Sequence, residues 1–289
     1  MNFQRIFEFW NTKFTDKNDS QWIGTCPFCH KEKHFYVNKE SGLWTCFICS
    51  PIGGNIYTFL NKIYENLLND KDDDLLRSLA RLKYVSYLKL KEWGIVPIHK
   101  HEYVIPYYND NGKICNLKRY PIGKKGLFTP ELRAGIYGVH QLFDVHKKRW
   151  PVFIVEAEFN AITLDWFFQK IGFKAICIAI HGTYNKDLID YLNGWPVYIC
   201  LDNDENARQA GIKLTVKLKP ICPAINILIW PEEFSKNYDI RDFIKDYVLQ
   251  PKDFEGGRAK LFSFFVDFKT DTLGDIALKN IPVCSYEEL

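Results

Sequence analysis

The stretches Val152–Glu156 (VFIVE) and Val197–Asp204 (VYICLDND) decide the fold. Each begins as a short apolar run rich in β-branched and aromatic residues, and each ends in carboxylates. An apolar run of this length is typical of a strand that is buried on both faces of a parallel sheet. Ligands of such sheets bind beyond the carboxyl ends of the strands. We therefore expect these carboxylates to line a crevice.

The sequence around these two runs alternates between helical and strand patterns. Helical spacing covers Glu158–Lys170, Tyr184–Leu192 and Glu205–Leu218, whereas Ala175–Ile180 and Ile225–Ile229 are continuous apolar runs. Alternation of strand and helix predicts an α/β domain with a mostly parallel sheet.

Four carboxylates are expected at one edge of that sheet. Glu156, Asp202 and Asp204 follow strands directly, and Asp239 comes after a later strand. Such oxygen ligands suit Mg²⁺ or Mn²⁺, whose coordination is completed by water and substrate phosphates. The alternative for the Asp-Asn-Asp triplet is a turn and a helix N-cap, since Asp and Asn favour both. Because Glu156 stands at an earlier strand end, we favour the metal site.

These residues resemble the motifs of the TOPRIM domain. Glu156-Ala157-Glu158-Phe159-Asn160, Asp202-Asn203-Asp204 and Asp239 are similar to its E-G-x-x-D, D-x-D and downstream acid. The resemblance implies the parallel α/β sheet of DnaG-type primases, topoisomerases, some nucleases and RecR-type recombination mediators. It makes Glu156, Asp202 and Asp204 catalytic acids and adds Asp239 as a ligand of Mg²⁺ or Mn²⁺.

The chain departs from the family pattern at three positions. Ala157 and Ala207 stand where relatives have glycine, and Asn160 stands where they have aspartate. Asparagine keeps an oxygen but loses a charge, so a cation that contacts Asn160 is expected to bind more weakly.

Two C-x-x-C pairs predict one structural Zn²⁺. Sixteen residues separate Cys26/Cys29 from Cys46/Cys49, and two such knuckles joined by a hairpin supply four thiolates for a tetrahedral ion. The alternatives are disulfides, buried thiols, or His30 in place of Cys29. A cytoplasmic chain disfavours disulfides, and the other cysteines lie singly, mostly in apolar runs.

The residues around the knuckles are candidates for contact with DNA. Lysines close to the cysteines offset the formal charge of a Cys₄ zinc site, and together with His34, Tyr36 and Trp44 they could meet phosphates and stack on bases. The alternative is a purely structural zinc staple.

Two further resemblances concern the N-terminal half. Cys26 to Leu60, with Gly53-Gly54 leading into an amphipathic helix, is similar to the zinc-binding domain of DnaG-type primases. The stretch from Tyr103 to Glu156 resembles the lead-in to the TOPRIM domain of bacteriophage primase–helicases. That resemblance implies binding of template and nucleotide phosphates by Lys118, Arg119, Lys125 and Arg133. Solubilising surface charge is the alternative for each of these four.

Composition and charge suggest how the chain is divided. Residues 95–150 hold ten Lys/Arg against four Asp/Glu, whereas 151–250 hold ten against thirteen. A basic part beside an acidic part would suit a polyanion next to a cation site. We expect an all-β zinc ribbon (1–70), a helical linker that tethers it flexibly (71–94), a basic subdomain with a hairpin turn at Asn109–Gly112 (95–150), a TOPRIM domain (151–250) and a tail (251–289).

The expected function is a DNA primase that makes short primers de novo on single-stranded DNA from nucleoside triphosphates by metal-dependent phosphoryl transfer. The alternatives are a TOPRIM nuclease and a non-catalytic zinc/TOPRIM recombination mediator. No P-loop motif occurs, so we expect a separate replicative helicase as partner. No apolar run is long enough for a membrane span and no signal peptide is recognisable. We therefore expect a cytoplasmic protein, and the compact form suggests that a plasmid or virus encodes it.

Overall fold

The structure is a computed structural model that describes residues 1–49, 53–69, 72–147, 150–181, 186–250 and 252–267. The chain divides into two compact units, Met1–Phe143 and Asp144–Leu289.

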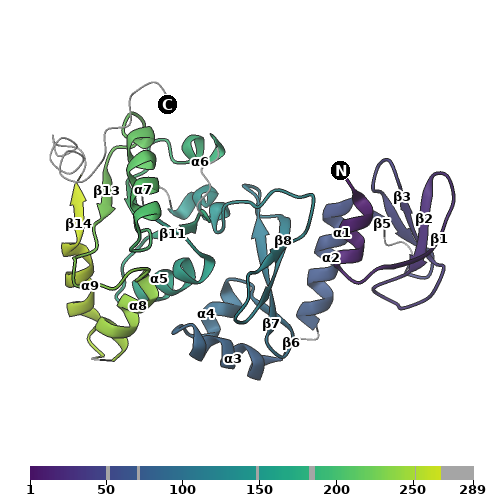
Figure 1. The fold of residues 1–289 in the computed structure, drawn as a ribbon, viewed down its shortest axis with the longest axis horizontal. Coiled ribbons are helices and arrows are strands. Elements are labelled where there is room, and N and C mark those ends of the chain that lie inside the picture. The colour runs from purple at the N-terminus through teal and green to yellow at the C-terminus, as the bar shows by residue number, and fades with distance from the viewer. Residues whose placement is uncertain (50–52, 70–71, 148–149, 182–185, 251, 268–289) are drawn as a thin grey trace. The chain divides into compact units, whose positions relative to one another are not determined.

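The first unit begins with an antiparallel sheet in which the strands follow chain order. This sheet contains β1 (Lys13–Lys17), β2 (Gln21–Thr25), β3 (Phe35–Asn38), β4 (Trp44–Cys46) and β5 (Gly53–Gly54). It is accompanied by α1 (Phe3–Phe9) and α2 (Ile56–Asn69), which lie side by side (Figure 1) and meet through Phe7 and Phe59, with ring centroids 4.5 Å apart. The predicted zinc ribbon is confirmed; its sheet is antiparallel, and two helices pack with it.

Two short helices, α3 (Asp73–Leu82) and α4 (Tyr87–Glu92), make up the predicted helical linker over 71–94. The helical conformation is interrupted at Tyr84, whose φ is +55°. The Ser86 side chain then caps α4 by accepting a hydrogen bond from the Leu88 N–H. A left-handed residue followed by a serine N-cap ends one helix and starts another.

A second antiparallel sheet follows in the first unit. Its strands are β6 (Val96–His99), β7 (Glu102–Tyr108), β8 (Ile114–Pro121) and β9 (Leu127–Phe128), again in chain order. The predicted turn between β7 and β8 is confirmed. Gly112 has φ +69°, and the Asn109 side chain accepts hydrogen bonds from the N–H groups of Asn111 and Lys113. Two short 3₁₀ turns, Val139–Phe143 and Val145–Lys147, come later in the chain.

One apolar core joins the ribbon to the second sheet. Phe7, Phe35 and Phe59 belong to the same buried cluster as Val104 and Leu117 of the β7/β8 hairpin. The expected flexible tether between the zinc module and the basic hairpin is therefore wrong. The physical reason is that the apolar side chains of α2 are buried in the same cluster as residues of both antiparallel sheets.

The second unit is the predicted α/β domain. Its sheet order is β11-β10-β12-β13-β14, with β10 (Val152–Val155), β11 (Ile176–Ala179), β12 (Val197–Ile199) and β13 (Ile225–Leu228) parallel and β14 (Phe265–Asp267) antiparallel to β13. The helices are α5 (Glu158–Lys170), α6 (Lys186–Tyr191), α7 (Glu205–Leu218), α8 (Ile240–Ile244) and α9 (Phe254–Ser263), with a π-helical turn at Lys245–Leu249. The first two residues of the predicted Tyr184–Leu192 helix lie outside the described residues.

Part of the expected C-terminal tail belongs to this domain. α9 and β14 lie within it, and β14 completes the sheet beside β13. Phe265 packs on Tyr198 with ring centroids 5.1 Å apart, and Phe262 lies 6.1 Å from Phe153. Residues 268–289 of that expected tail lie outside the described residues.

Among the described helices, none combines the length and the apolar character that crossing a membrane requires.

Candidate metal centres and nucleic-acid contacts

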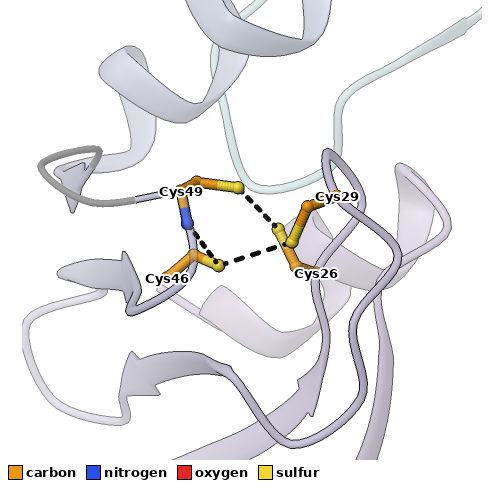
Figure 2. A group of neighbouring side chains, drawn as sticks. All are labelled: Cys26, Cys29, Cys46 and Cys49. Carbon is orange, nitrogen blue, oxygen red and sulfur yellow. Dashed lines mark hydrogen bonds between the residues drawn. The ribbon is translucent and has the colours of Figure 1, made fainter.

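Four cysteines of the first unit point at a common centre (Figure 2). Cys26 and Cys29 lie between β2 and β3, Cys46 ends β4, and Cys49 follows it. Their sulfur atoms all lie within 4.8 Å of one another. The pairs Cys26/Cys49 and Cys29/Cys46 are each 3.8 Å apart, and a tetrahedral Zn²⁺ with Zn–S bonds of about 2.3 Å requires sulfur separations of about 3.8 Å. The cluster therefore fits zinc.

Backbone groups support this cluster. The N–H groups of Phe28 and Cys49 donate to the sulfur atoms of Cys26 and Cys46, each at 3.4 Å. Burial raises the pKa of Cys26 to about 11, so a bound cation is needed to hold its thiolate at neutral pH. His30 is exposed and outside the cluster, so the four-cysteine reading of the sequence is the one that the geometry supports.

The predicted stacking of Trp44 on a DNA base is wrong. Trp44 is only 3% exposed, its ring stacks on Phe35, and its indole N–H donates to the Asn55 carbonyl and the Thr58 hydroxyl. A ring buried in this way belongs to the core.

Sequence reasoning missed Phe47, which lies inside the second knuckle. Its side chain is 64% exposed and meets Tyr36 edge to face at 5.0 Å. His34, the other predicted template contact in the ribbon, is half-buried, and its carbonyl accepts a hydrogen bond from the Phe47 N–H. Position within a knuckle does not predict this exposure, because Phe28 of the first knuckle packs on Trp44 and Phe59 instead.

The four basic residues predicted to bind phosphates have different surroundings. Lys118 is 9% exposed and holds its ammonium 5.1 Å from the Phe128 ring centroid. The Arg119 guanidinium donates to both carboxylate oxygens of Glu102, at 2.7 and 3.1 Å, and to the Phe9 carbonyl. Lys125 and Arg133 are exposed. The phosphate-binding role stays a prediction for these residues, and Lys125 and Arg133 are the two of the four that are exposed.

The acidic rim of the second unit consists of Glu156, Asp202, Asp204 and Asp239. Glu156 follows β10, and Asp202 and Asp204 follow β12. Asp204 accepts a hydrogen bond from the Ala207 N–H at 2.8 Å and so caps α7. The helix-cap alternative thus holds for Asp204, whose second oxygen can still face a ligand.

Asp239 is the most engaged of the four acids. It caps α8 by accepting hydrogen bonds from the N–H groups of Arg241 and Asp242, and its other oxygen pairs with the Arg241 guanidinium at 2.6 Å. A cation at the rim has to compete with Arg241 for this carboxylate.

The acids of the rim influence one another electrostatically. Burial, followed by the nearby charge of Asp204, raises the pKa of Glu156. Burial and then the charges of Glu156 and Asp239 raise the pKa of Asp202 to about 7, although Arg241 acts in the opposite direction. A cation would relieve this repulsion.

The rim nevertheless is not a closed ligand shell. Among the described residues, no set of three or more acidic groups brings its oxygen atoms within 4.8 Å of one another as the cysteines do. One feature beside Asp202 does fit a hard cation. Asn160 donates from its amide nitrogen to Asp202 at 3.2 Å, while its amide oxygen is buried without a hydrogen-bond partner in a residue 1% exposed. A buried acceptor of this kind gains from a bound cation or an ordered water.

Two more residues lie near the rim and were not predicted from the sequence. His181 donates its backbone N–H to the Glu156 carbonyl, and its ring nitrogen Nε2 lies 3.2 Å from the Glu158 carboxylate. Trp230 donates its indole N–H to the Leu201 carbonyl at 2.9 Å. Asp202 and Asp204 also line a cavity of about 500 Å³, together with residues of α7 and of the loop that contains Trp230.

Comparison with known proteins identifies the N-terminal module. Residues 9–84 match the family model of the CHC2 zinc finger, the DnaG zinc ribbon. Comparison with curated proteins found no match.

Solved structures resemble most of the chain, between 72% and 97% of its length in the three described next. The zinc-binding and RNA polymerase domains of the Aquifex aeolicus primase align with a TM-score of 0.51 and 15% identity, over 97% of this chain and 87% of that one. The E. coli primase catalytic core aligns with a TM-score of 0.58 and 13% identity, over 79% and 85%. A DnaG primase catalytic domain bound to single-stranded DNA aligns with a TM-score of 0.53 and 12% identity, over 72% and 76%. The chain therefore has a CHC2 zinc ribbon of the DnaG type, followed by the fold of the DnaG primase catalytic core.

Proposed function

We propose that this protein is a DNA primase that synthesises short primers de novo on single-stranded DNA from nucleoside triphosphates. The observation that supports this best is the occurrence, in one chain with the DnaG fold, of a cysteine cluster that fits zinc and a carboxylate rim at the ends of β10 and β12.

In this proposal the rim is the catalytic centre. Glu156, Asp202 and Asp204 hold Mg²⁺ or Mn²⁺, and Asp239 is the outer member because Arg241 already neutralises part of its charge. Bound there, the cations supply a lowered pKa for the primer 3′-hydroxyl and charge neutralisation on the α-phosphate and the leaving pyrophosphate. Asn160 orients the Asp202 carboxylate through its amide N–H.

The first unit supplies the binding of nucleic acid in this proposal. The ribbon presents Phe47 and Tyr36 for contact with template bases. Lys125 and Arg133 are exposed cations suited to template or nucleotide phosphates. Arg119 contributes indirectly, because it joins α1 to the β7/β8 hairpin through Phe9 and Glu102. A separate replicative helicase would deliver the template.

The deciding experiment is nucleotide incorporation on unprimed single-stranded DNA of mixed sequence, with Mg²⁺ or Mn²⁺ and with either ribo- or deoxyribonucleotides. Wild type is compared with Asp202→Ala and with Asp190→Ala, which removes an exposed acid of α6 outside the rim. We expect short products from wild type and Asp190→Ala, and none from Asp202→Ala. Equal synthesis by Asp202→Ala would overturn the assignment of the rim.

Two other outcomes would replace the proposal. DNA cleavage without added nucleotides would indicate a TOPRIM nuclease. Tight DNA binding that persists after chelation of Mg²⁺, with no products under any condition, would indicate a recombination mediator.

A further inference from the structure

Asn203, the middle residue of the Asp-Asn-Asp triplet, ties the rim to a distant segment. Its backbone N–H donates to the Tyr238 carbonyl at 2.8 Å, and its own carbonyl accepts from the Asn237 N–H at 2.8 Å. Its side-chain NH₂ donates to the carbonyls of Phe234 and Ser235, each at 3.0 Å. One residue thus makes four hydrogen bonds to the segment 234–238.

A second tether lies beside the first. Trp230 donates to the carbonyl of Leu201, the residue that precedes Asp202. Its ring packs against Phe234 and Tyr238, with centroids 5.6 and 5.3 Å away, and both of those side chains are buried. The segment from Trp230 to Tyr238 is therefore held against residues 201–203 by hydrogen bonds and by an aromatic cluster.

The segment held in this way ends directly at Asp239. Asp239, like Asp202, belongs to the acidic rim, so the hydrogen bonds of Asn203 connect two parts of the rim through one short piece of backbone. These hydrogen bonds hold the Asp202–Asp204 turn beside the segment that leads into α8. Both carbonyls that face the Asn203 side chain need donors, which asparagine provides and aspartate or alanine does not.

We propose that Asn203 is a positioning residue that fixes the distance between the Asp202–Asp204 turn and Asp239, and thereby sets the affinity of the rim for a divalent cation. This inference rests on the proposed function for the role of the rim, but cation binding tests it without reference to primer synthesis.

The primary test measures binding of Mn²⁺ to the full-length, zinc-loaded chain by calorimetry and by the electron paramagnetic resonance signal of unbound Mn²⁺. Asn203→Ala removes the two side-chain hydrogen bonds, and we expect the dissociation constant at the rim to rise about ten-fold. Asn193→Ala, at an exposed position outside the rim, is the matched control and should bind as wild type does. Zinc content and thermal unfolding are recorded for each variant.

A second variant tests the neighbouring tether independently. Trp230→Phe keeps an aromatic ring but removes the indole N–H that reaches Leu201, so we expect a rise of about three-fold in the dissociation constant. If Asn203→Ala does not fold, the Mn²⁺ dissociation constant of Trp230→Phe tests the proposal on its own. Unchanged Mn²⁺ affinity in the folded variants, or Mn²⁺ binding that Asp202→Ala does not alter, would overturn the inference.

Primer synthesis supplies a readout that a general loss of structure would not give. With Asn203→Ala, the Mg²⁺ concentration for half-maximal synthesis should rise while the rate at saturating Mg²⁺ stays near that of wild type. A lower rate at saturation with an unchanged Mg²⁺ requirement contradicts positioning. If wild type makes no primers at all, the proposed function fails, and the Mn²⁺ measurements still decide the role of Asn203.

Discussion

The cysteine cluster and the acidic rim are the two candidate metal sites, and the chain assembles them in different ways. The cysteines come from two knuckles within 24 residues of sequence, and their sulfur atoms already have the spacing of a zinc tetrahedron. The acids come from three strand or helix ends spread from Glu156 to Asp239, and two of them also cap helices. The four cysteines form a closed set of ligands, whereas the acids among the described residues do not.

The two clusters are also expected to differ in their effect on the stability of the fold. Thiolates around zinc gain their binding energy in the folded state. Carboxylates gathered without a cation repel one another, and α7, α8 and Asn203 have to hold them in place.

Loss of zinc should have the largest effect. Cys46→Ser removes one of four ligands, and structural zinc contributes about 10 kcal/mol or more to folding in small zinc modules. Because the ribbon shares its core with the β7/β8 hairpin, we expect cooperative loss of structure in both. Metal analysis and circular dichroism on heating would measure this, with Cys115→Ser, a cysteine outside the cluster, as control. Full zinc occupancy in Cys46→Ser would contradict the assignment.

The acidic rim should make stability depend on pH in the opposite sense from a carboxylate that gains a cationic partner on folding. The pKa of Asp202 rises from 3.8 to about 7 on folding, so the folded state holds this proton more tightly than the unfolded state. Its contribution is therefore fully present below about pH 4 and is lost as the pH rises to about 7. Denaturant unfolding without divalent cations would measure the decline.

Two comparisons isolate the contribution of Asp202 to that decline. Asp202→Asn should flatten the dependence between pH 4 and 7. Saturating Mg²⁺ should raise the stability of wild type more at pH 8 than at pH 5, because cations bind the ionised carboxylates. An identical pH profile for Asp202→Asn and wild type would contradict the raised pKa.

Asn160→Asp should shift the rim toward stronger cation binding and lower intrinsic stability. The substitution adds a buried charge beside Asp202 and removes the amide N–H that donates to it. We expect Mn²⁺ affinity to increase about five-fold and the free energy of unfolding without cations to fall by about 1–2 kcal/mol. Titration calorimetry and denaturant unfolding measure the two effects. Weaker Mn²⁺ binding would show that the Asn160 hydrogen bond matters more than the added charge.

Phe47→Ala should produce the smallest effect and only on DNA binding. The ring is exposed on the second knuckle, and one base stacked on an aromatic ring contributes about 1 kcal/mol at the lower end of the range. We expect about a five-fold loss of affinity for single-stranded DNA by fluorescence anisotropy, with unchanged zinc content. Leu43→Ala, which shortens an exposed aliphatic side chain of the ribbon, is the control. Equal losses for both variants would rule out stacking.

The regular elements and the zinc ligands were predictable because their signals are local. The helices over Glu158–Lys170 and Glu205–Leu218 have the predicted bounds, since periodic apolar residues lie between recognisable ends. The zinc cluster follows from the spacing of its cysteines. The grouping of the four rim acids was inferred from strand ends and from a family resemblance, and its metal-binding role stays a prediction.

The features that were not predicted depend mainly on contacts between residues that are far apart in the sequence. The side-chain hydrogen bonds of Asn203 join residues that are more than 30 positions apart in the sequence, and no periodic pattern predicts them. Trp44 has an aromatic ring of the kind that stacks on bases, but this ring is buried against Phe35 and Phe59. Tyr84 ends a helix through its backbone conformation, which nothing in the apolar spacing of that segment indicates.

The antiparallel strand β14 has a consequence for any shortened form of this protein. β14 covers the backbone edge of β13, and Phe262 and Phe265 shield the aromatic pair of Phe153 and Tyr198. A fragment that ends at residue 250 would leave an unpaired strand edge bordered by exposed aromatic rings, which is a template for intermolecular strand addition. Fragments cut at that point would therefore self-associate, whereas those that retain residues 252–267 keep the edge covered.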